Sequence, residues 1–365
     1  MTAYIIFLFI MLLLTIINGS LMPLLRDKRQ SSFTPSVSIL IPMRNEEANV
    51  KPLLDSLGHI TYRELEILIL DDGSTDQTAE KLVEASSKDQ RIHLLEGEDL
   101  PKGWVGKVHA CYQLSKQAKG DFLLFLDADV RVHPNIIDRS LHAFTEKTGL
   151  VTGFPQIPLK SLLGHLLVPM QHFLVFFHLP VLLANHTLWD KSTAAHGAYM
   201  MFRKKAYDEI NGHYSVKASL VEDIHIAKIM KRTGWNVRLV NNTNTVQCFM
   251  YETNKEVWEG FSKNFFPGLG RSITIMTAII IFYSLLFLLP VPIAFLGIYT
   301  GELLYFLPLL LTLSIKLAVD LFTRQKPWLF ILFPLSIVMM FTILAYSAFL
   351  GFSKRGFTWK GRNYQ

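Results

Sequence analysis

Cysteine is scarce in this sequence: only Cys111 and Cys248 occur among 365 residues. Two cysteines argue against a disulfide framework and fit a reducing compartment. The sequence also contains no internal repeat and no low-complexity tract. Its net charge of +6 is modest, and the basic residues concentrate beside apolar segments. That placement fits contact with anionic lipid headgroups, and nothing indicates a nucleic-acid partner.

Charge is absent from residues 4–25, a stretch long enough to span a bilayer. It lacks both a basic region before it and a small-residue cleavage site after it. We therefore expect an uncleaved transmembrane anchor over residues 1–29 rather than a signal peptide. Arg26, Lys28 and Arg29 follow at once, which predicts that the next domain is cytoplasmic.

Three further apolar stretches, at residues 273–299, 303–319 and 328–351, predict a transmembrane block over residues 273–352. A basic tail follows at residues 353–365. The protein is thus expected in the cell membrane as a multi-pass protein with a cytoplasmic globular domain.

The charges near these stretches conflict over topology. Three crossings would place the basic tail outside, against the positive-inside rule, whereas Lys316, Arg324 and Lys326 fit an inward loop. We expect a cytoplasmic tail, with one stretch folded as a re-entrant or interfacial hairpin. The candidate breaks are the prolines at positions 290, 292 and 334.

Residues 30–272 have the pattern of an α/β domain. Short apolar runs at residues 36–42, 65–70, 92–95 and 122–126 are typical of buried strands, and helical patterns separate them. Strands that alternate with helices predict a mostly parallel, doubly wound sheet.

Acidic residues follow two of these strands: Asp71 and Asp72 after one, Asp127 and Asp129 after another. The carboxyl ends of parallel strands share one edge, where ligands bind in open α/β sheets. Four carboxylates on one edge repel each other unless they face hydrogen-bond donors or a cation. Carboxylate oxygens suit Mg²⁺ or Mn²⁺ held against a diphosphate. A solvated turn would account for one such motif, but two favour a nucleotide and metal site.

Further motifs extend this pattern. Residues 41–47, residues 71–76, the pair Gly106-Lys107, residues 127–129 and the pair Glu222-Asp223 occur in that order. Over residues 36–270 the chain thereby resembles the family 2 inverting glycosyltransferases of the GT-A fold. It is especially similar to bacterial membrane enzymes that glycosylate a lipid in carotenoid synthesis. Residues 106–113, 259–263 and 359–364 carry that similarity.

The resemblance implies roles for individual residues. Asp129 would ligate Mg²⁺ or Mn²⁺ on the diphosphate, and Asp223 would be the general base. Glu222 and Gly197 would lie on the acceptor side. The residues expected to bind the nucleotide-sugar are Pro42, Glu46, Asp71, Asp72, Lys107 and Asp127.

The chemistry supports a base at Asp223 independently of the resemblance. Glycosyl transfer needs a neutralised diphosphate leaving group and a base for the acceptor proton. Residues 220–230 predict an amphipathic helix with Glu222 and Asp223 in its first turn. The alternative is that the two acids only complement the helix dipole.

Two features concern the acceptor. The Gln-x-x-Arg-Trp motif of processive synthases is missing at residues 260–266, which favours one or a few transfers onto a small acceptor. Apolar residues including Leu166 and Phe173 form one stripe on a helix expected within residues 158–186. We interpret it as an interfacial helix on the membrane, with a core helix packed on the sheet as the alternative. Residues 196–202 are expected to line the acceptor cleft.

The sequence therefore predicts a membrane glycosyltransferase that moves one sugar from a nucleotide-sugar to a lipid, with inversion. The resemblance implies UDP-glucose as donor and an acceptor such as a carotenoid carboxylate. Hopanoid, diacylglycerol and polyprenyl phosphate are the alternative acceptors. A catalytically silent membrane scaffold is the other alternative, and the presence of Asp72, Asp129 and Asp223 speaks against it.

Overall fold

The computed structural model describes residues 1–27, 34–352, 357–359 and 362–364. The chain divides into a sheet unit, Met22–Gln156 with Leu179–Phe249, and a helical unit, Met1–Leu21 with Ile157–His178 and Met250–Gln365. The sequence placed residues 157–178 and 250–272 in the domain with the sheet, but contacts group them with the apolar helices. Most of the basic tail, including Lys354, Arg355 and Lys360, lies outside the described residues.

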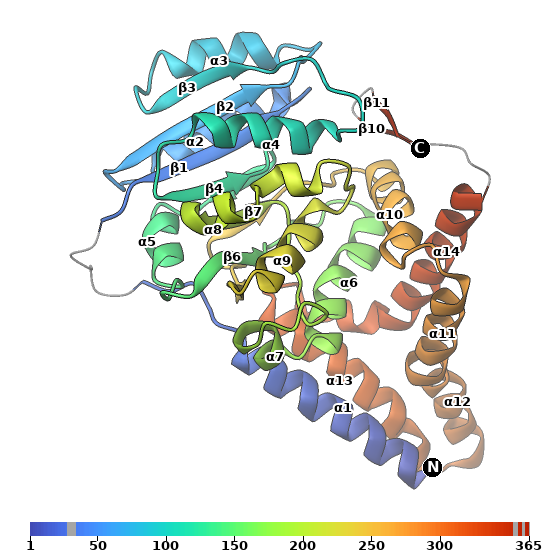
Figure 1. Ribbon diagram of the computed structural model, residues 1–365. Coiled ribbons are helices and arrows are strands. Elements are labelled where there is room, and N and C mark those ends of the chain that lie inside the picture. Colours follow the sequence, from blue (N-terminus) through green and yellow to red (C-terminus); the bar gives the residue numbers. More distant parts are fainter. Residues whose placement is uncertain (28–33, 353–356, 360–361, 365) are drawn as a thin grey trace. The chain divides into compact units, whose positions relative to one another are not determined.

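The described part of the sheet unit contains a seven-stranded sheet in the order β3-β2-β1-β4-β7-β6-β8 (Figure 1). All neighbouring strands are parallel except β7, which is antiparallel to β4 and β6. The mostly parallel sheet predicted from the sequence is confirmed. The strands are β1 (Val37–Met43), β2 (Leu65–Asp71), β3 (Ile92–Glu96), β4 (Phe122–Leu126), β6 (Thr148–Phe154), β7 (Tyr199–Arg203) and β8 (Asn236–Asn241). A separate antiparallel pair joins β5 (Val130–Val132) to β9 (Val246–Cys248).

Helices cover the sheet, and their apolar faces form its core with the strands. One buried cluster joins residues of α4, α8 and α9 to alternate residues of the strands, because side chains along a strand point to opposite faces. The helices of this unit are α2 (Glu47–Gly58), α3 (Thr78–Ser86), α4 (Gly106–Gln117), α5 (Ile136–Leu141), α7 (Val181–His186), α8 (Lys204–Glu209) and α9 (Glu222–Arg232), with a 3₁₀ turn at Gly212–Val216.

Strand register brings distant residues to one edge of the sheet. β1 is parallel to β2 and β4, so Asp71 and Asp127 come at the same edge. β7 runs in the opposite direction and pairs its first residue, Tyr199, with Leu126 at the end of β4. Gly197, just before β7, therefore comes at this edge too.

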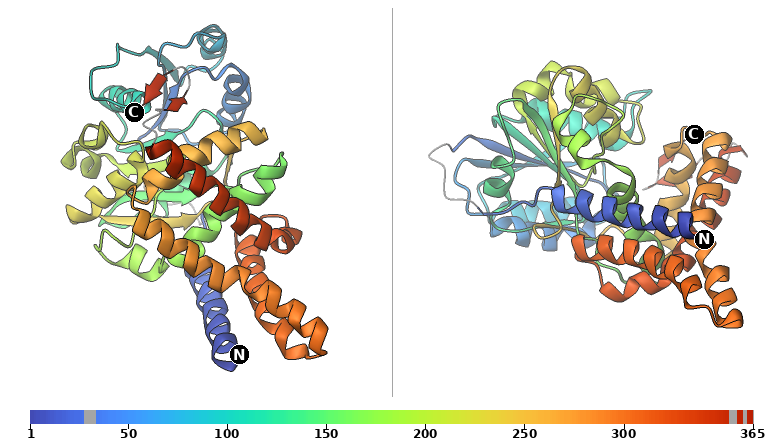
Figure 2. Two further views of the ribbon diagram at one scale, coloured as in Figure 1. Left: turned by 90° about the vertical axis from the view of Figure 1, so that its right-hand side faces the viewer. Right: turned by 90° about the horizontal axis from the view of Figure 1, so that it is seen from below.

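The helical unit contains α1 (Thr2–Leu21), α6 (Leu162–His178), α10 (Asn254–Gly268), α11 (Ile273–Tyr283), α12 (Pro290–Thr300), α13 (Leu307–Phe322) and α14 (Phe333–Phe352). It also has a π-helical segment (Ser284–Leu288), 3₁₀ turns at Leu303–Phe306 and Pro327–Leu332, and a hairpin of β10 (Phe357–Trp359) and β11 (Arg362–Tyr364). Helices α1 and α13 lie side by side (Figure 2). A Cβ atom on Gly19 would meet the Phe322 ring at 2.4 Å, so glycine permits this close approach.

Among the described residues, four helical stretches are long and apolar enough to cross a membrane: Thr2–Leu21, Ile273–Thr300, Leu303–Phe322 and Pro327–Phe352. They match the anchor and the transmembrane block expected from the sequence. The sequence predicts that Lys316 lies in an inward loop, and this prediction is wrong. It lies inside α13, buried and paired with Asp320. Pro290 begins α12, and only Leu289 separates it from the π-helical segment.

Helix α6 does not present its apolar stripe as an interfacial helix would. Leu166 and Phe173 are buried within the helical unit, where α6 packs on α1, α10, α13 and α14. The Phe173 ring contacts the rings of Phe287 and Phe333 at 5.5 and 4.9 Å between centroids. The stripe therefore packs as a core helix, although on apolar helices rather than on the sheet. Periodicity located the apolar face but could not tell what covers it.

Candidate functional site

The loops that follow β1 and β2 are hydrogen-bonded to each other. Arg44 donates to the carbonyl oxygen of Asp72. Asn45 has a left-handed backbone, with φ of 52°; its N–H donates to the Ser74 hydroxyl at 2.9 Å, and its side-chain oxygen accepts the Thr75 N–H at 2.8 Å. The sequence motifs contained Arg44 and Asn45, but sequence reasoning gave them no role.

These bonds fix the acids expected to bind the nucleotide. The Asp71 carboxylate accepts the backbone N–H and the hydroxyl of Ser74. Asp72 is buried at the end of the strand, and its N–H donates to the Met43 carbonyl at 2.8 Å. Glu46 lies immediately before α2, and its carboxylate accepts from Asn49 at 2.9 Å. Pro42, in β1, pairs with Leu70 in the strand that leads to these acids.

An ion-pair centre lies at the end of β4, the neighbouring strand of β1. The ammonium of Lys107, in the first turn of α4, lies 2.7 Å from Asp127 Oδ1 and 3.4 Å from Glu222 Oε1. Burial by itself lowers the pKa of Lys107, but the two carboxylates outweigh it and raise that pKa above the usual value. Lys107 therefore stays protonated and holds the start of α9 against the edge of the sheet at which Asp71 and Asp127 lie, which we call the acid edge.

Asp223 joins this centre through Gly197. The Gly197 N–H donates to Asp223 Oδ2 at 3.0 Å. A Cβ atom on Gly197 would lie 3.1 Å from Lys107 Nζ, 3.5 Å from Glu222 Oε1 and 3.7 Å from Asp223 Oδ2. These three charged groups thus surround one point that only a glycine leaves open. The structure brings together the residues predicted from the Glu222-Asp223 motif, the Gly106-Lys107 motif and Asp127.

The protonation of Asp223 is tuned by this enclosure. Burial and the neighbouring Glu222 raise the pKa of Asp223 to about 7, against lowering contributions from the Ile224 and Gly197 N–H groups and from Lys107. A carboxylate whose pKa lies near neutral pH can accept a proton and return it, which is what a general base requires. An acid that only complemented a helix dipole would be solvated and would keep an ordinary pKa.

Asp129 lies apart from the Lys107 ion pairs. Its Oδ1 accepts from the Cys248 thiol at 3.4 Å, and its carbonyl accepts the Phe249 N–H at 2.9 Å. In the described residues no group of three or more His, Cys, Asp or Glu side chains could hold a metal alone. A metal at Asp129 would thus take most of its ligands from a diphosphate and water, a mode of binding common for Mg²⁺. The donor set fits a metal that arrives with its substrate.

His196 is a further residue at this edge. Its Nδ1 accepts the Ala198 N–H at 3.3 Å, so Nε2 carries the ring hydrogen. Burial and the charge of Lys107 lower the pKa of His196 to about 4 against the opposing effect of Asp127, so the ring is neutral at pH 7. The sequence predicted His196 in the acceptor cleft only because it lies within residues 196–202. Its tautomer depends on the hydrogen bond from the Ala198 N–H, which no sequence pattern predicts.

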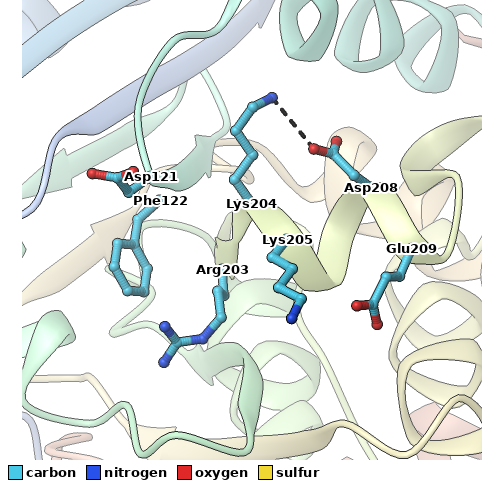
Figure 3. Close-up of a pocket in the computed structure, with 7 residues that line it drawn as sticks. All are labelled: Asp121, Phe122, Arg203, Lys204, Lys205, Asp208 and Glu209. Carbon is cyan, nitrogen blue, oxygen red and sulfur yellow. Dashed lines mark ion pairs between the residues drawn. The ribbon is translucent and has the colours of Figure 1, made fainter.

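A shallow cavity of about 720 Å³ lies at the opposite edge of the sheet (Figure 3). It is lined by Asp121, Phe122, Arg203, Lys204, Lys205, Asp208 and Glu209. Phe122 begins β4 whereas Asp127 follows its end, so the strand length of about 16 Å separates the two. Arg203 is engaged with the carbonyls of Thr145 and Thr148. This cavity is therefore separate from the acid site, by which we mean Asp127, Glu222 and Asp223 with Lys107.

Residues 3–365 match the sequence profile of glycosyl transferase family 21. The chain belongs to this family.

Two curated proteins that are similar to this chain share one name with each other. The 4,4'-diaponeurosporenoate glycosyltransferase of Staphylococcus haemolyticus (strain JCSC1435) is 26% identical over 254 residues, and that of Staphylococcus aureus (strain N315) is 28% identical over 261 residues. Both alignments cover 67% of this chain and 65% of the relative, slightly less than two thirds of its length.

A solved structure shows the same fold. The mannosyltransferase PcManGT from Pyrobaculum calidifontis, in complex with GDP-Man and Mn²⁺, superposes with a TM-score of 0.58 at 17% identity. The match covers 97% of this chain and 99% of that chain. The GT-A fold expected from the sequence is confirmed.

Proposed function

We propose that this protein transfers one sugar from a nucleotide-sugar to a lipid, with inversion, at the edge formed by Asp72, Asp127 and Asp223. The observation that carries the proposal is the enclosure of Asp223, which is held by the Gly197 N–H with a pKa near 7. A silent scaffold has no need of a buried carboxylate tuned to neutral pH, because burying it is costly.

The reaction follows from these groups. An acceptor oxygen attacks the anomeric carbon, the bond from that carbon to the diphosphate breaks, and Asp223 takes the acceptor proton. Attack from the face opposite the leaving group inverts the anomeric centre. Lys107, at the positive N-terminus of α4, would stabilise the departing diphosphate.

The residues for the donor are those at the ends of β1 and β2. Pro42, Glu46, Asp71 and Asp72 would contact the nucleotide. Asp129, beside Asp127, would hold Mg²⁺ or Mn²⁺, which neutralises the charge that develops on the leaving group. The Mn²⁺ and GDP-Man bound to PcManGT support a metal and a nucleotide-sugar here, without deciding between Mg²⁺ and Mn²⁺. UDP-glucose is the donor we propose, from the resemblance alone.

The names of the two staphylococcal relatives support a carotenoid carboxylate as acceptor. A carboxyl group delivered from an apolar phase stays protonated, because desolvation disfavours its charged form. It therefore needs a base before it can attack, and Asp223 supplies one. Glu222 and Gly197 would lie on the acceptor side, and His196 would donate a hydrogen bond from its Nε2–H to the acceptor.

We also propose that the four apolar helical stretches lie in the cell membrane, one of the last three as a re-entrant or interfacial hairpin, and that the sheet unit faces the cytoplasm. The positive charge of Arg26 and the residues after it supports this orientation. The cytoplasmic placement of the tail stays a prediction. Labelling a cysteine added at position 26 or 365 with an impermeant reagent in intact cells would test the placement of the sheet unit and of the tail, respectively.

The deciding experiment is an assay for transfer. Membranes containing the protein are incubated with radiolabelled UDP-glucose, UDP-galactose or GDP-mannose and with a C30 carotenoid carboxylic acid, and the lipid extract is then resolved. We expect label in a lipid that moves with a glycosyl ester and is lost in Asp223→Asn. If no donor labels any lipid while the nucleotide still binds, the scaffold alternative holds.

A further inference from the structure

The sheet unit carries an exposed apolar surface on α7 and the loop that follows it. The exposed residues are Leu182 and Leu183 of α7, the helix labelled in Figure 1, with Leu188 and Trp189 after it; we call these four residues the α7 surface. Leu182 and Trp189 are 53% and 54% exposed. Four large apolar side chains exposed within eight residues of sequence mark an interaction surface, whereas single ones are normal on soluble proteins.

The α7 surface is held rigidly. The ammonium of Lys231, a buried residue, donates to the carbonyls of Ala184 and Ser192, each at 2.7 Å. Asn185 exchanges two hydrogen bonds with Leu239 of β8, at 2.7 and 2.9 Å. The exposure of the apolar side chains is therefore fixed by the fold and is not the result of a loose loop.

The charges around the α7 surface point to its partner. Lys191 is exposed beside Trp189, and Arg232, also exposed, forms an ion pair with Asp190 at 2.6 Å. Tryptophan and leucine flanked by lysine and arginine are the residues that favour the boundary between lipid headgroups and acyl chains. Basic residues there are attracted to anionic lipids.

The path of the chain supports the same partner. The sheet unit resumes at Leu179, directly after α6 of the helical unit, and α7 begins two residues later. Leu24, three residues after the end of α1, bridges to Asn241 at the end of β8, the strand on which α7 packs. Leu24 is itself exposed. Helix α7 thus packs on the strand whose last residue is joined to Leu24.

We propose that the α7 surface inserts into the headgroup region of the bilayer and keeps the acid site at the membrane. The proposal rests on the membrane attachment given under Proposed function. The same contacts connect the α7 surface to the proposed base. Lys231 donates to the segment that precedes Gly197, and Lys231 belongs to α9, the helix that begins with Glu222 and Asp223. A lipid acceptor would then enter beside the base.

Spin labels can measure this insertion in the full-length protein. Cys111 and Cys248 are both buried, so a nitroxide reagent would label a cysteine introduced by Leu182→Cys or Trp189→Cys. The matched control is Val83→Cys on α3, because Val83 is an exposed apolar residue of the same unit, at 64%, away from α7. Each variant is placed in nanodiscs that contain phosphatidylglycerol, and collision rates with oxygen and with a water-soluble nickel chelate are compared.

We expect the labels at positions 182 and 189 to collide several-fold more with oxygen, relative to nickel, than the label at position 83. Equal ratios at all three positions would overturn the proposal. Labels at 182 and 189 shielded from both reagents would indicate a protein partner, such as a second copy, and would also overturn it. Because no sugar transfer is needed, insertion without transfer would count against the proposed function alone.

An activity measurement adds a second readout. The double change Leu182→Glu with Trp189→Glu places charges that must leave the apolar phase. We expect transfer to lipid to fall at least 10-fold while hydrolysis of the nucleotide-sugar by water persists, which also shows that the variant is folded. Val83→Glu should change neither. Unchanged transfer in the double variant would overturn the proposal.

Discussion

The backbone N–H of Gly197 donates to Oδ2 of Asp223 at 3.0 Å, and this bond joins two residues that lie 26 positions apart in the sequence. Gly197 precedes β7, and Asp223 is in the first turn of α9. The bond orients the carboxylate, whose other oxygen, Oδ1, accepts the N–H of Ile224 at 2.8 Å.

Replacing the base should separate chemistry from binding. Asp223→Asn keeps the size of the side chain but removes its basicity, so we expect turnover to fall by about 10²-fold or more. Nucleotide affinity, measured by calorimetry, should stay close to that of the wild type. Asp208→Asn, at an exposed acid of α8, is the control and should change neither quantity. Normal turnover in Asp223→Asn would remove this residue from the mechanism.

The pH profile tests the environment of the same residue. Asp223 must be ionised to accept a proton and its pKa is raised to about 7, so kcat/KM should rise with pH through about 7 and level off above it. Glu222→Gln removes a like charge, which should lower the pKa of Asp223 and move the midpoint to lower pH. A midpoint that does not move would show that Glu222 has no electrostatic effect on the base.

A methyl group at position 197 should disturb the charged centre. Gly197→Ala places a Cβ atom 3.1 Å from Lys107 Nζ, closer than most such contacts, so Lys107 must shift. We expect turnover to fall about 10-fold, because small misplacement of reacting groups is costly. Gly58→Ala, where a Cβ atom meets nothing within 4 Å, is the matched control. Equal turnover of both variants would contradict the arrangement described.

The metal prediction concerns Asp129. Because one carboxylate and a diphosphate would share the ion, Mn²⁺ should bind weakly alone and more tightly with UDP, as measured by calorimetry. Asp129→Ala should lose that gain and abolish transfer. Chelation should stop transfer reversibly. Full transfer by protein shown to be free of metal in excess chelator would refute the assignment.

The buried face of α6 leads to a prediction about stability. Phe173 is fully buried among other aromatic rings, so Phe173→Ala should destabilise the protein by about 3–5 kcal/mol and lower its Tm in detergent. Leu162, on the same helix, is 66% exposed, and Leu162→Ala should leave Tm nearly unchanged. Equal Tm values for the two variants would restore the interfacial interpretation of α6.

The sequence by itself determined the features that are local. The apolar stretches predicted the candidate spans, since length and composition are enough to identify a helix that could cross a membrane. The acids at positions 71, 72, 127 and 129 predicted an acidic edge of the sheet, because parallel strands end on the same side. The pair Glu222 and Asp223 at a helix start was visible for the same reason: each signal lies within a few neighbouring residues.

Only the tertiary structure decided what depends on pairing between distant segments. The antiparallel direction of β7 brings Gly197 to the edge of the sheet at which Asp127 lies, and no pattern near either residue encodes that direction. The pKa of Asp223 comes from burial and from Lys107 and Glu222, which converge only when α4 and α9 pack on the sheet. The face of α6 shows the same limit: periodicity gives an apolar stripe, but the free energy of burying it is similar against lipid or protein, so only packing could decide.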